Sequence, residues 1–199
     1  MTMFHSGNRD LQQRFGSTAL ADRLVERLRR SEFNDEDRQF IQSLEFFFVA
    51  TAAPDGHPDC SFKGGAPGFV RIVRPDLLVW PDYDGNGMFK TLGNIGHNPF
   101  VGLLFIRMGE APKRLRVNGR AEVVLEDPLM NEFVGAQALI CVTPIDIFPN
   151  CPRYIPDLVT GQASPYVPYA DRAPLEPVWK SNPAWQEVVP PRYQRPWKE

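Results

Sequence analysis

The feature that most constrains the fold is a succession of short apolar segments between residues 46 and 148, separated by turn residues. Each segment has the length of a β-strand, and a helix over residues 87–97 separates the third from the fourth. Closely spaced short strands favour a β-barrel or sandwich over a doubly wound parallel sheet. Six strands are expected. The second has two parts, residues 59–63 and 68–73, which are interrupted by glycines, and the others cover residues 46–53, 77–80, 101–107, 115–125 and 138–148.

The N-terminal region, residues 1–34, is expected to form a helical segment. Leucines recur at helical spacing over residues 18–30, which places them on one face of a helix. A second helix is expected to begin at Asn34 or Asp35, because both are good N-caps. We expect both helices to pack against the sheet of a domain that spans residues 35–155.

The C-terminal region, residues 156–199, changes in character. Its prolines exclude long helices and central strands. A disordered linker is normally poor in aromatic residues, whereas this region is rich in them. We therefore expect an extended arm that packs on the barrel or on a second subunit. Its aromatic residues are Tyr166, Tyr169, Trp179, Trp185, Tyr193 and Trp197.

Composition argues against several classes of protein. A formal net charge of −2 lacks the basic excess of a nucleic-acid-binding protein. No run approaches the ~20 apolar residues that cross a bilayer, and the N-terminus lacks the apolar core of a secretory signal, so we expect a cytoplasmic protein. Three cysteines without a C-x-x-C pair and three scattered histidines predict neither a disulfide framework nor a zinc site.

The first segment that could form a binding site covers residues 61–69. Glycines weaken a strand unless the backbone must approach something closely, and here they follow Ser61 and Lys63. A lysine beside exposed backbone amides is one way in which proteins hold phosphate. The alternative is a bulged hairpin with a surface lysine at Lys63, next to Gly64.

The second segment, residues 80–95, leads from a strand through a glycine-rich loop into a helix. The N-terminal amides of a helix form an anion site, to which Lys90 and Thr91 can add a charge and a hydroxyl. The spacing matches neither a P-loop nor the dinucleotide fingerprint G-x-G-x-x-G. The alternative is an ordinary loop and helix cap.

In the third segment, residues 115–121, Arg116, Asn118 and Arg120 alternate with apolar residues and share one face of a strand. They form either a solvated outer face or a cluster facing a ligand. No catalytic triad is expected, because Ser61 and its polar neighbours His57 and Asp59 lie on one strand, too close in sequence for a relay.

In this order, the segments resemble the pyridoxamine 5'-phosphate oxidase-like superfamily of flavin-binding proteins, over about residues 35–153. The flavin-nucleotide-binding branch is more similar than the vitamin B6 oxidases proper. The resemblance implies a mainly β fold with flanking helices, a six-stranded antiparallel split β-barrel. The matching segments are residues 47–51, 55–58, 64–70, 82–94, 98–105 and 116–121.

The resemblance also implies flavin mononucleotide (FMN) bound in the groove of a homodimer. Its phosphate would be held at Ser61, Lys63 and Gly64 together with Lys90 and Thr91. The family has an Arg-Lys pair where this chain has Lys90 and Thr91, so one charge is missing. The isoalloxazine ring or ribityl chain would be lined by Asp82, Tyr83 and Asn86, and the neighbouring subunit would supply Arg116 and Asn118.

The resemblance does not name a substrate. Vitamin B6 oxidases end in a segment with arginine and histidine that grips the substrate phosphate, whereas no histidine follows His97 here and residues 192–196 do not reproduce the motif. We therefore do not expect pyridoxamine phosphate. Residues 151–154 are expected to close one side of the pocket. The expected function is FMN-dependent redox chemistry on a small molecule; the alternatives are a flavin carrier or sensor without turnover, or a deazaflavin- or haem-binding relative.

Overall fold

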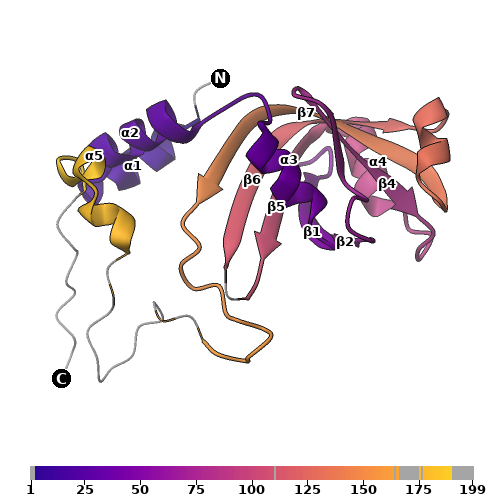
Figure 1. Cartoon of the computed structure of the whole chain (residues 1–199). Coiled ribbons are helices and arrows are strands. Elements are labelled where there is room, and N and C mark those ends of the chain that lie inside the picture. The colour runs from indigo at the N-terminus through magenta and orange to yellow at the C-terminus, as the bar shows by residue number, and fades with distance from the viewer. Residues whose placement is uncertain (1–2, 110, 164, 166–174, 176, 190–199) are drawn as a thin grey trace, which may run out of the picture.

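A computed structural model describes residues 3–109, 111–163, 165, 175 and 177–189, and its main body is an antiparallel sheet (Figure 1). The described strands are β1 Phe46–Ala52, β2 Pro58–Gly64, β3 Arg71–Arg74, β4 Leu77–Tyr83, β5 Phe100–Arg107, β6 Lys113–Val124 and β7 Ala136–Asn150. The helices are α1 Ser6–Arg14, α2 Thr18–Leu28, α3 Asp35–Gln42, α4 Lys90–His97 and α5 Pro183–Gln186, with 3₁₀ turns η1 Pro128–Glu132 and η2 Val178–Ser181.

The sheet corrects part of the expected fold class. An antiparallel, mainly β fold with flanking helices is confirmed, but the expected six-stranded barrel is wrong in its strand number and closure. Seven strands in the described residues form an open sheet in the order β2-β1-β5-β6-β7-β4-β3. The segment expected to continue from residue 59 to 73 is divided by a turn in which Gly68 has φ +88°. After this turn the chain pairs with β4, so β2 and β3 lie at opposite edges.

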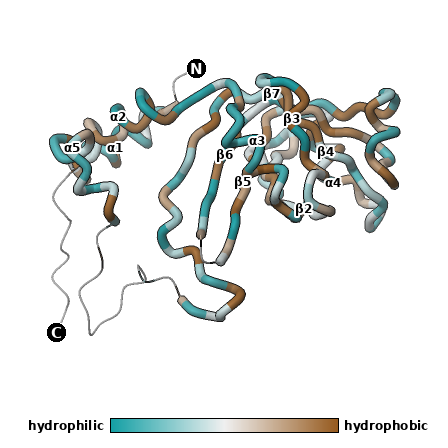
Figure 2. The backbone as a smooth tube through the Cα atoms, in the orientation of Figure 1, coloured by the Kyte–Doolittle hydropathy of each residue, from teal (hydrophilic) through white to brown (hydrophobic). Residues whose placement is uncertain are grey.

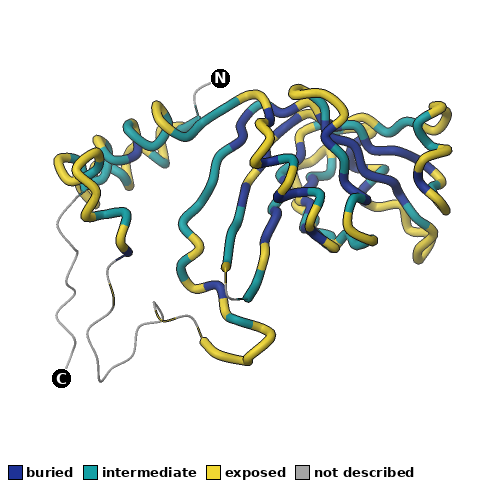
Figure 3. The backbone as a smooth tube through the Cα atoms, viewed as in Figure 1, coloured by how far each residue is buried: buried dark blue, intermediate teal, exposed yellow. Residues whose placement is uncertain are grey.

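An aromatic cluster joins the two ends of the open sheet. Phe47 of β1 is fully buried, and its ring centroid lies 5.2 Å from that of Trp80 on β4, in an edge-to-face arrangement. The same ring contacts Phe105 of β5 at 5.1 Å and Phe69 at 5.9 Å. Buried residues run along the strands in Figure 3, and apolar residues gather on β4 and β7 in Figure 2. Side-chain packing therefore joins β1 to β4, although no backbone ladder does so in the described residues.

The helices divide into two groups. α3 begins as expected, with Asn34 as the N-cap and its side chain accepting a hydrogen bond from Asp37 N at 2.8 Å, and it packs on the core. α1 lies within residues 1–34, the region expected to be helical, and it has no buried residue. α1, α2 and α5 lie together, away from the main body of the sheet (Figure 1), and Arg23 Nη1 donates to the Ala184 carbonyl at 3.0 Å.

The α5 part of the C-terminal arm thus lies against α2, while Tyr166, Tyr169, Tyr193 and Trp197 lie outside the described residues. The division of the chain at residues 34 and 155 stays a prediction. None of the helices in the described part is both long enough and apolar enough to cross a membrane.

We predict that Phe47→Ala lowers the free energy of unfolding by about 3–5 kcal/mol, because it removes the ring that contacts β4, β5 and the segment before β3. Urea denaturation followed by circular dichroism measures the change. Phe15→Ala is the control, since Phe15 is half exposed, and it should cost less than about 1 kcal/mol. Equal losses in both variants would contradict the role given to Phe47.

Candidate functional site

One face of the edge strand β2 carries polar side chains towards the core side of the sheet. Residues paired across an antiparallel ladder point to the same side. Asp59, Ser61 and Lys63 pair with β1 residues whose side chains are buried, so they turn inward and are half-buried themselves. Their β1 partners are Thr51, Val49 and Phe47.

The end of β4 meets this face of β2. Lys63 Nζ lies 3.9 Å from Asp82 Oδ1, and the Asp82 side chain is only 10% exposed. Gln137 fixes that carboxylate, because its Nε2 donates to Asp82 Oδ2 at 2.9 Å and to the Tyr83 carbonyl at 3.2 Å. The ion pair therefore bridges β2 and β4, which belong to the two separate ends of the open sheet.

The N-terminus of α4 adds a second cation to the same region. Lys90 Nζ lies 3.0 Å from Asp59 Oδ1. The helix is fixed on β1, since Asn94 Nδ2 donates to Thr51 Oγ1 at 2.9 Å in a buried contact. In the part of the chain that the structure describes, the N-cap residue of α4 makes no side-chain cap hydrogen bond. That residue, Phe89, has φ 48°, a left-handed conformation rare for a large side chain. The first amides of α4 are thus left for another acceptor.

The structure brings together most of the predicted phosphate residues. Ser61 and Lys63 share the inner face of β2, Lys90 is joined to that strand through Asp59, and Thr91 is buried in the first turn of α4. Both lysines are paired with carboxylates. The region therefore combines two lysines, two aspartates and the positive end of a helix, and can hold an anion that competes with the aspartates for the lysines.

Other predicted site residues lie elsewhere. Asn86 is exposed, and its Oδ1 accepts a hydrogen bond from Met88 N at 3.0 Å within the loop. Arg116 and Asn118 are exposed on the opposite face of the sheet, where they pair with Leu104 and Gly102 of β5. Within one subunit they do not join Lys63, because the inward residues of β6 are the apolar ones that alternate with them.

The glycines after Lys63 have a packing role. An ideal Cβ on Gly65 would lie 2.6 Å from Phe69 Cγ, and one on Gly64 would lie 2.9 Å from Phe62 Cε1. At Gly65 the contact involves the base of the buried Phe69 side chain, so there is no room for a Cβ, whereas at Gly64 it involves the end of the exposed Phe62 ring. Close approach of Phe69 thus accounts for glycine at position 65 without a ligand.

Sequence reasoning did not assign Asp59, Asn94 or Gln137 to the site. Asp59 could have been found, because it lies two and four residues before Ser61 and Lys63 and therefore shares their face of β2. Nothing in the sequence near Gln137 signals its contact with Asp82, which depends on the pairing of β7 with β4.

A family model, Pyridoxamine 5'-phosphate oxidase, matches residues 33–149, more than half of the chain. The chain belongs to this family. The match includes the inner face of β2, the end of β4, α4 and β6. No protein of curated function matches the chain.

Several solved structures are similar to the chain. HupZ from Group A Streptococcus is 18% identical with a TM-score of 0.48, over 66% of this chain and 98% of HupZ. An FMN-binding protein from Syntrophomonas wolfei is 10% identical with a TM-score of 0.47, over 72% of this chain and 96% of its own. HutZ, the heme storage protein of Vibrio cholerae, is 17% identical with a TM-score of 0.44, over 59% of this chain and 95% of HutZ.

We predict that Gly65→Ala lowers the free energy of unfolding by about 1–3 kcal/mol in the absence of any ligand, because the new methyl group overlaps Phe69. Gly93→Ala is the matched control. Gly93 lies within α4 with nothing near its Cβ position, so this change should raise stability by up to about 1 kcal/mol. Urea denaturation of both variants provides the measurement. Unchanged stability in Gly65→Ala would indicate that the glycine serves a ligand instead.

Proposed function

We propose that the protein binds FMN beside the N-terminus of α4 and serves as a flavin-dependent oxidoreductase for a small molecule. The observation that carries the proposal is the convergence of Lys63, Lys90 and the uncapped first turn of α4, in a chain of the pyridoxamine 5'-phosphate oxidase family. A phosphate monoester suits this combination of cations and free amides.

The residues present fit the phosphate of FMN. Ser61 on β2 and Thr91 on α4 offer hydroxyls, and Gly64 at the end of β2 offers its backbone. Asp59 and Asp82 partly neutralise the two lysines, so the phosphate would displace at least one ion pair. The pair Lys90–Asp59 is the easier one to displace, because it is the more exposed of the two and exposed ion pairs contribute about 1 kcal/mol or less. The remaining positive charge would come from the helix terminus and from a second subunit.

We propose that a second copy completes the site. The outer face of β1 and β2 carries three phenylalanines in contact: Phe46 and Phe62 stack at 5.5 Å, and Phe48 meets Phe62 edge-to-face at 6.0 Å. Phe62 is 61% exposed although it is a large apolar side chain. Such patches are typical of protein–protein interfaces. Arg116 and Asn118 share this outer face, so in a homodimer they would be donated across the interface to the flavin.

The flavin would supply hydride transfer, and the protein would orient and tune it. Tyr83 and the loop that contains Asn86 follow β4 and would line the ring or the ribityl chain, with Asp82 fixed by Gln137. Lys63 and Arg116 are the candidates for stabilising the charge of reduced flavin. Pyridoxamine phosphate is not proposed as substrate, because residues 192–196 include no histidine.

A flavin carrier without turnover is the second candidate. It is favoured by the pairing of both carboxylates at the site, Asp59 with Lys90 and Asp82 with Lys63. Neither candidate needs a metal, and the described residues contain no cluster of metal-ligating side chains.

We predict that Lys63→Gln and Lys90→Gln each raise the Kd for FMN about tenfold or more, because each removes a charged partner of the phosphate. Riboflavin, which has no phosphate, should bind both variants and the wild type alike. Lys113→Gln is the control, since Lys113 pairs with Glu36 away from α4. Fluorescence quenching of each flavin gives the Kd values.

The cofactor and the activity can be tested on the same preparation. Mass spectrometry of the extracted cofactor distinguishes FMN from deazaflavin or haem. Anaerobic bleaching of the flavin absorbance by NADH or NADPH supports an oxidoreductase, and tight flavin binding without bleaching supports a carrier. A colourless protein that binds no added FMN overturns the proposal.

We predict that Phe62→Asp converts a wild-type dimer into a monomer, because a carboxylate would be buried in the apolar face of β1 and β2. Light scattering coupled to size-exclusion chromatography measures the mass. Val134→Asp is the control, since Val134 is exposed in the segment between η1 and β7, and it should leave the mass unchanged. A monomeric wild-type protein, or a dimeric Phe62→Asp variant, contradicts the proposed interface.

A further inference from the structure

The two aspartates of the candidate site are held in different ways. The Asp82 side chain is 10% exposed and is fixed by two groups, since Gln137 Nε2 donates to its Oδ2 at 2.9 Å and Lys63 Nζ lies 3.9 Å from its Oδ1. The Asp59 side chain is 20% exposed, and its ion-pair partner among the described residues is Lys90, at 3.0 Å. Asp59 is therefore the carboxylate that can give up its cation to an incoming anion.

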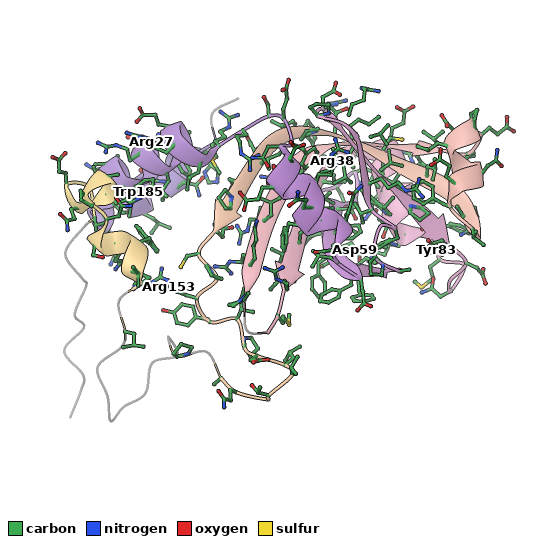
Figure 4. The ribbon with its side chains drawn as sticks, in the orientation of Figure 1. Arg27, Arg38, Asp59, Tyr83, Arg153 and Trp185 are labelled. Atoms are coloured by element: carbon green, nitrogen blue, oxygen red, sulfur yellow. The ribbon has the colours of Figure 1, made fainter. Side chains whose placement is uncertain are left out.

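Helix α4 is attached to the β1–β2 hairpin at two points. Lys90, in the first turn, contacts Asp59. One turn later, Asn94 Nδ2 donates to Thr51 Oγ1 at 2.9 Å, and both of these side chains are buried. Thr51 pairs with Asp59, which Figure 4 shows in the main body of the sheet, so the two side chains share the inner face. The buried bond from Asn94 would keep α4 in place after Lys90 had exchanged Asp59 for another anion.

Asp59 also cancels charge that would otherwise attract a phosphate. The charges of the two lysines at the site, Lys63 and Lys90, are balanced by those of the two aspartates. The helix terminus adds only about half an elementary charge. A carboxylate and a phosphate compete for the same ammonium group, because both accept charge-assisted hydrogen bonds from it. The free energy needed to separate Asp59 from Lys90 therefore reduces the free energy of phosphate binding.

We propose, on the basis of the proposed function, that Asp59 is an internal competitor of the flavin phosphate: it holds Lys90 when no phosphate is bound, and it weakens the hold on FMN so that bound flavin exchanges with flavin in solution. Binding of FMN would transfer Lys90 from Asp59 to the phosphate, and release of FMN would return it. A carboxylate beside the phosphate also speeds dissociation, since it recaptures the lysine as the phosphate leaves.

Titration of the full chain with FMN, followed by fluorescence quenching, tests the proposal. Asp59→Asn keeps the shape of the side chain and removes its charge, so it should lower the Kd for FMN about fivefold, the size expected for a partly exposed ion pair. Dissociation of FMN, measured by stopped flow, should become slower, and the Kd for riboflavin, which has no phosphate, should not change. Asp55→Asn is the matched control, since the exposed Asp55 precedes β2 and pairs with His57; it should bind FMN like the wild type.

A double-mutant cycle separates competition for Lys90 from general charge repulsion. An internal competitor acts through Lys90, so in the Lys90→Gln background Asp59→Asn should change the Kd for FMN by less than about twofold. An equal decrease in both backgrounds would mean that Asp59 merely repels the phosphate, and it overturns the proposal, as does an unchanged or higher Kd in Asp59→Asn alone. Circular dichroism checks the fold of each variant, and Asp59→Ser takes the place of Asp59→Asn if the latter does not fold.

Inorganic phosphate separates failure of this proposal from failure of the proposed flavin function, because its calorimetric titration needs no flavin. In a protein that takes up no FMN, phosphate binding that is about fivefold tighter in Asp59→Asn, and only when Lys90 is present, supports the internal competitor while the flavin function fails. Equal affinity of the wild type and Asp59→Asn for FMN leaves the flavin function standing and overturns the role given to Asp59. A protein in which neither form binds FMN or phosphate overturns both.

Discussion

The contact between Phe47 and Trp80 is the constraint on which the rest of the structure depends. The sheet is open, so no backbone ladder in the described residues joins its two ends, and the buried aromatic cluster holds β1 near β4 instead. β2 is paired to β1, and Asp82 is on β4. The distance between Lys63 and Asp82 is therefore set by packing in the core. The candidate site lies where the two ends of the sheet meet, with α4 fixed beside it through Asn94 and Thr51.

This position explains the chemistry of the site. In a closed barrel, a neighbouring strand would satisfy the free edge of β2, and backbone pairing would fill the space that Lys63 and Asp82 now bridge. The open edge leaves polar side chains half-buried next to the uncapped end of a helix. Half-burial strengthens electrostatic interactions while leaving access for a ligand. Because the sheet is open between β2 and β4, the aromatic cluster is needed to hold its two ends together. The same gap provides space for an anion.

The sequence predicted those parts of the fold that depend on local patterns. Alternation along residues 115–125 correctly separated the buried Leu115 and Val117 from the exposed Arg116, and Asn34 was recognised as a cap. The division of one expected strand into β2 and β3 was missed, because it depends on which distant strand each half joins. The hydrogen bond from Gln137 to Asp82 and the packing of the Phe69 ring against Gly65 were missed for the same reason. Contacts between segments far apart in the chain determined them, and no local pattern records such contacts.

The outer face of the sheet is divided into an apolar part and a cationic part. The phenylalanines of β1 and β2 lie on one side, and the arginines of β6 and of the segment after β7 lie on the other. A two-fold interface uses the same surface on both subunits, but a residue away from the two-fold axis meets a different residue of the partner and not its own copy. In the proposed dimer, contact between the two apolar parts would therefore leave each cationic part facing another region of the partner subunit. The positive charges then favour an arrangement in which Arg116 approaches an anionic group, which agrees with its proposed role beside the flavin phosphate.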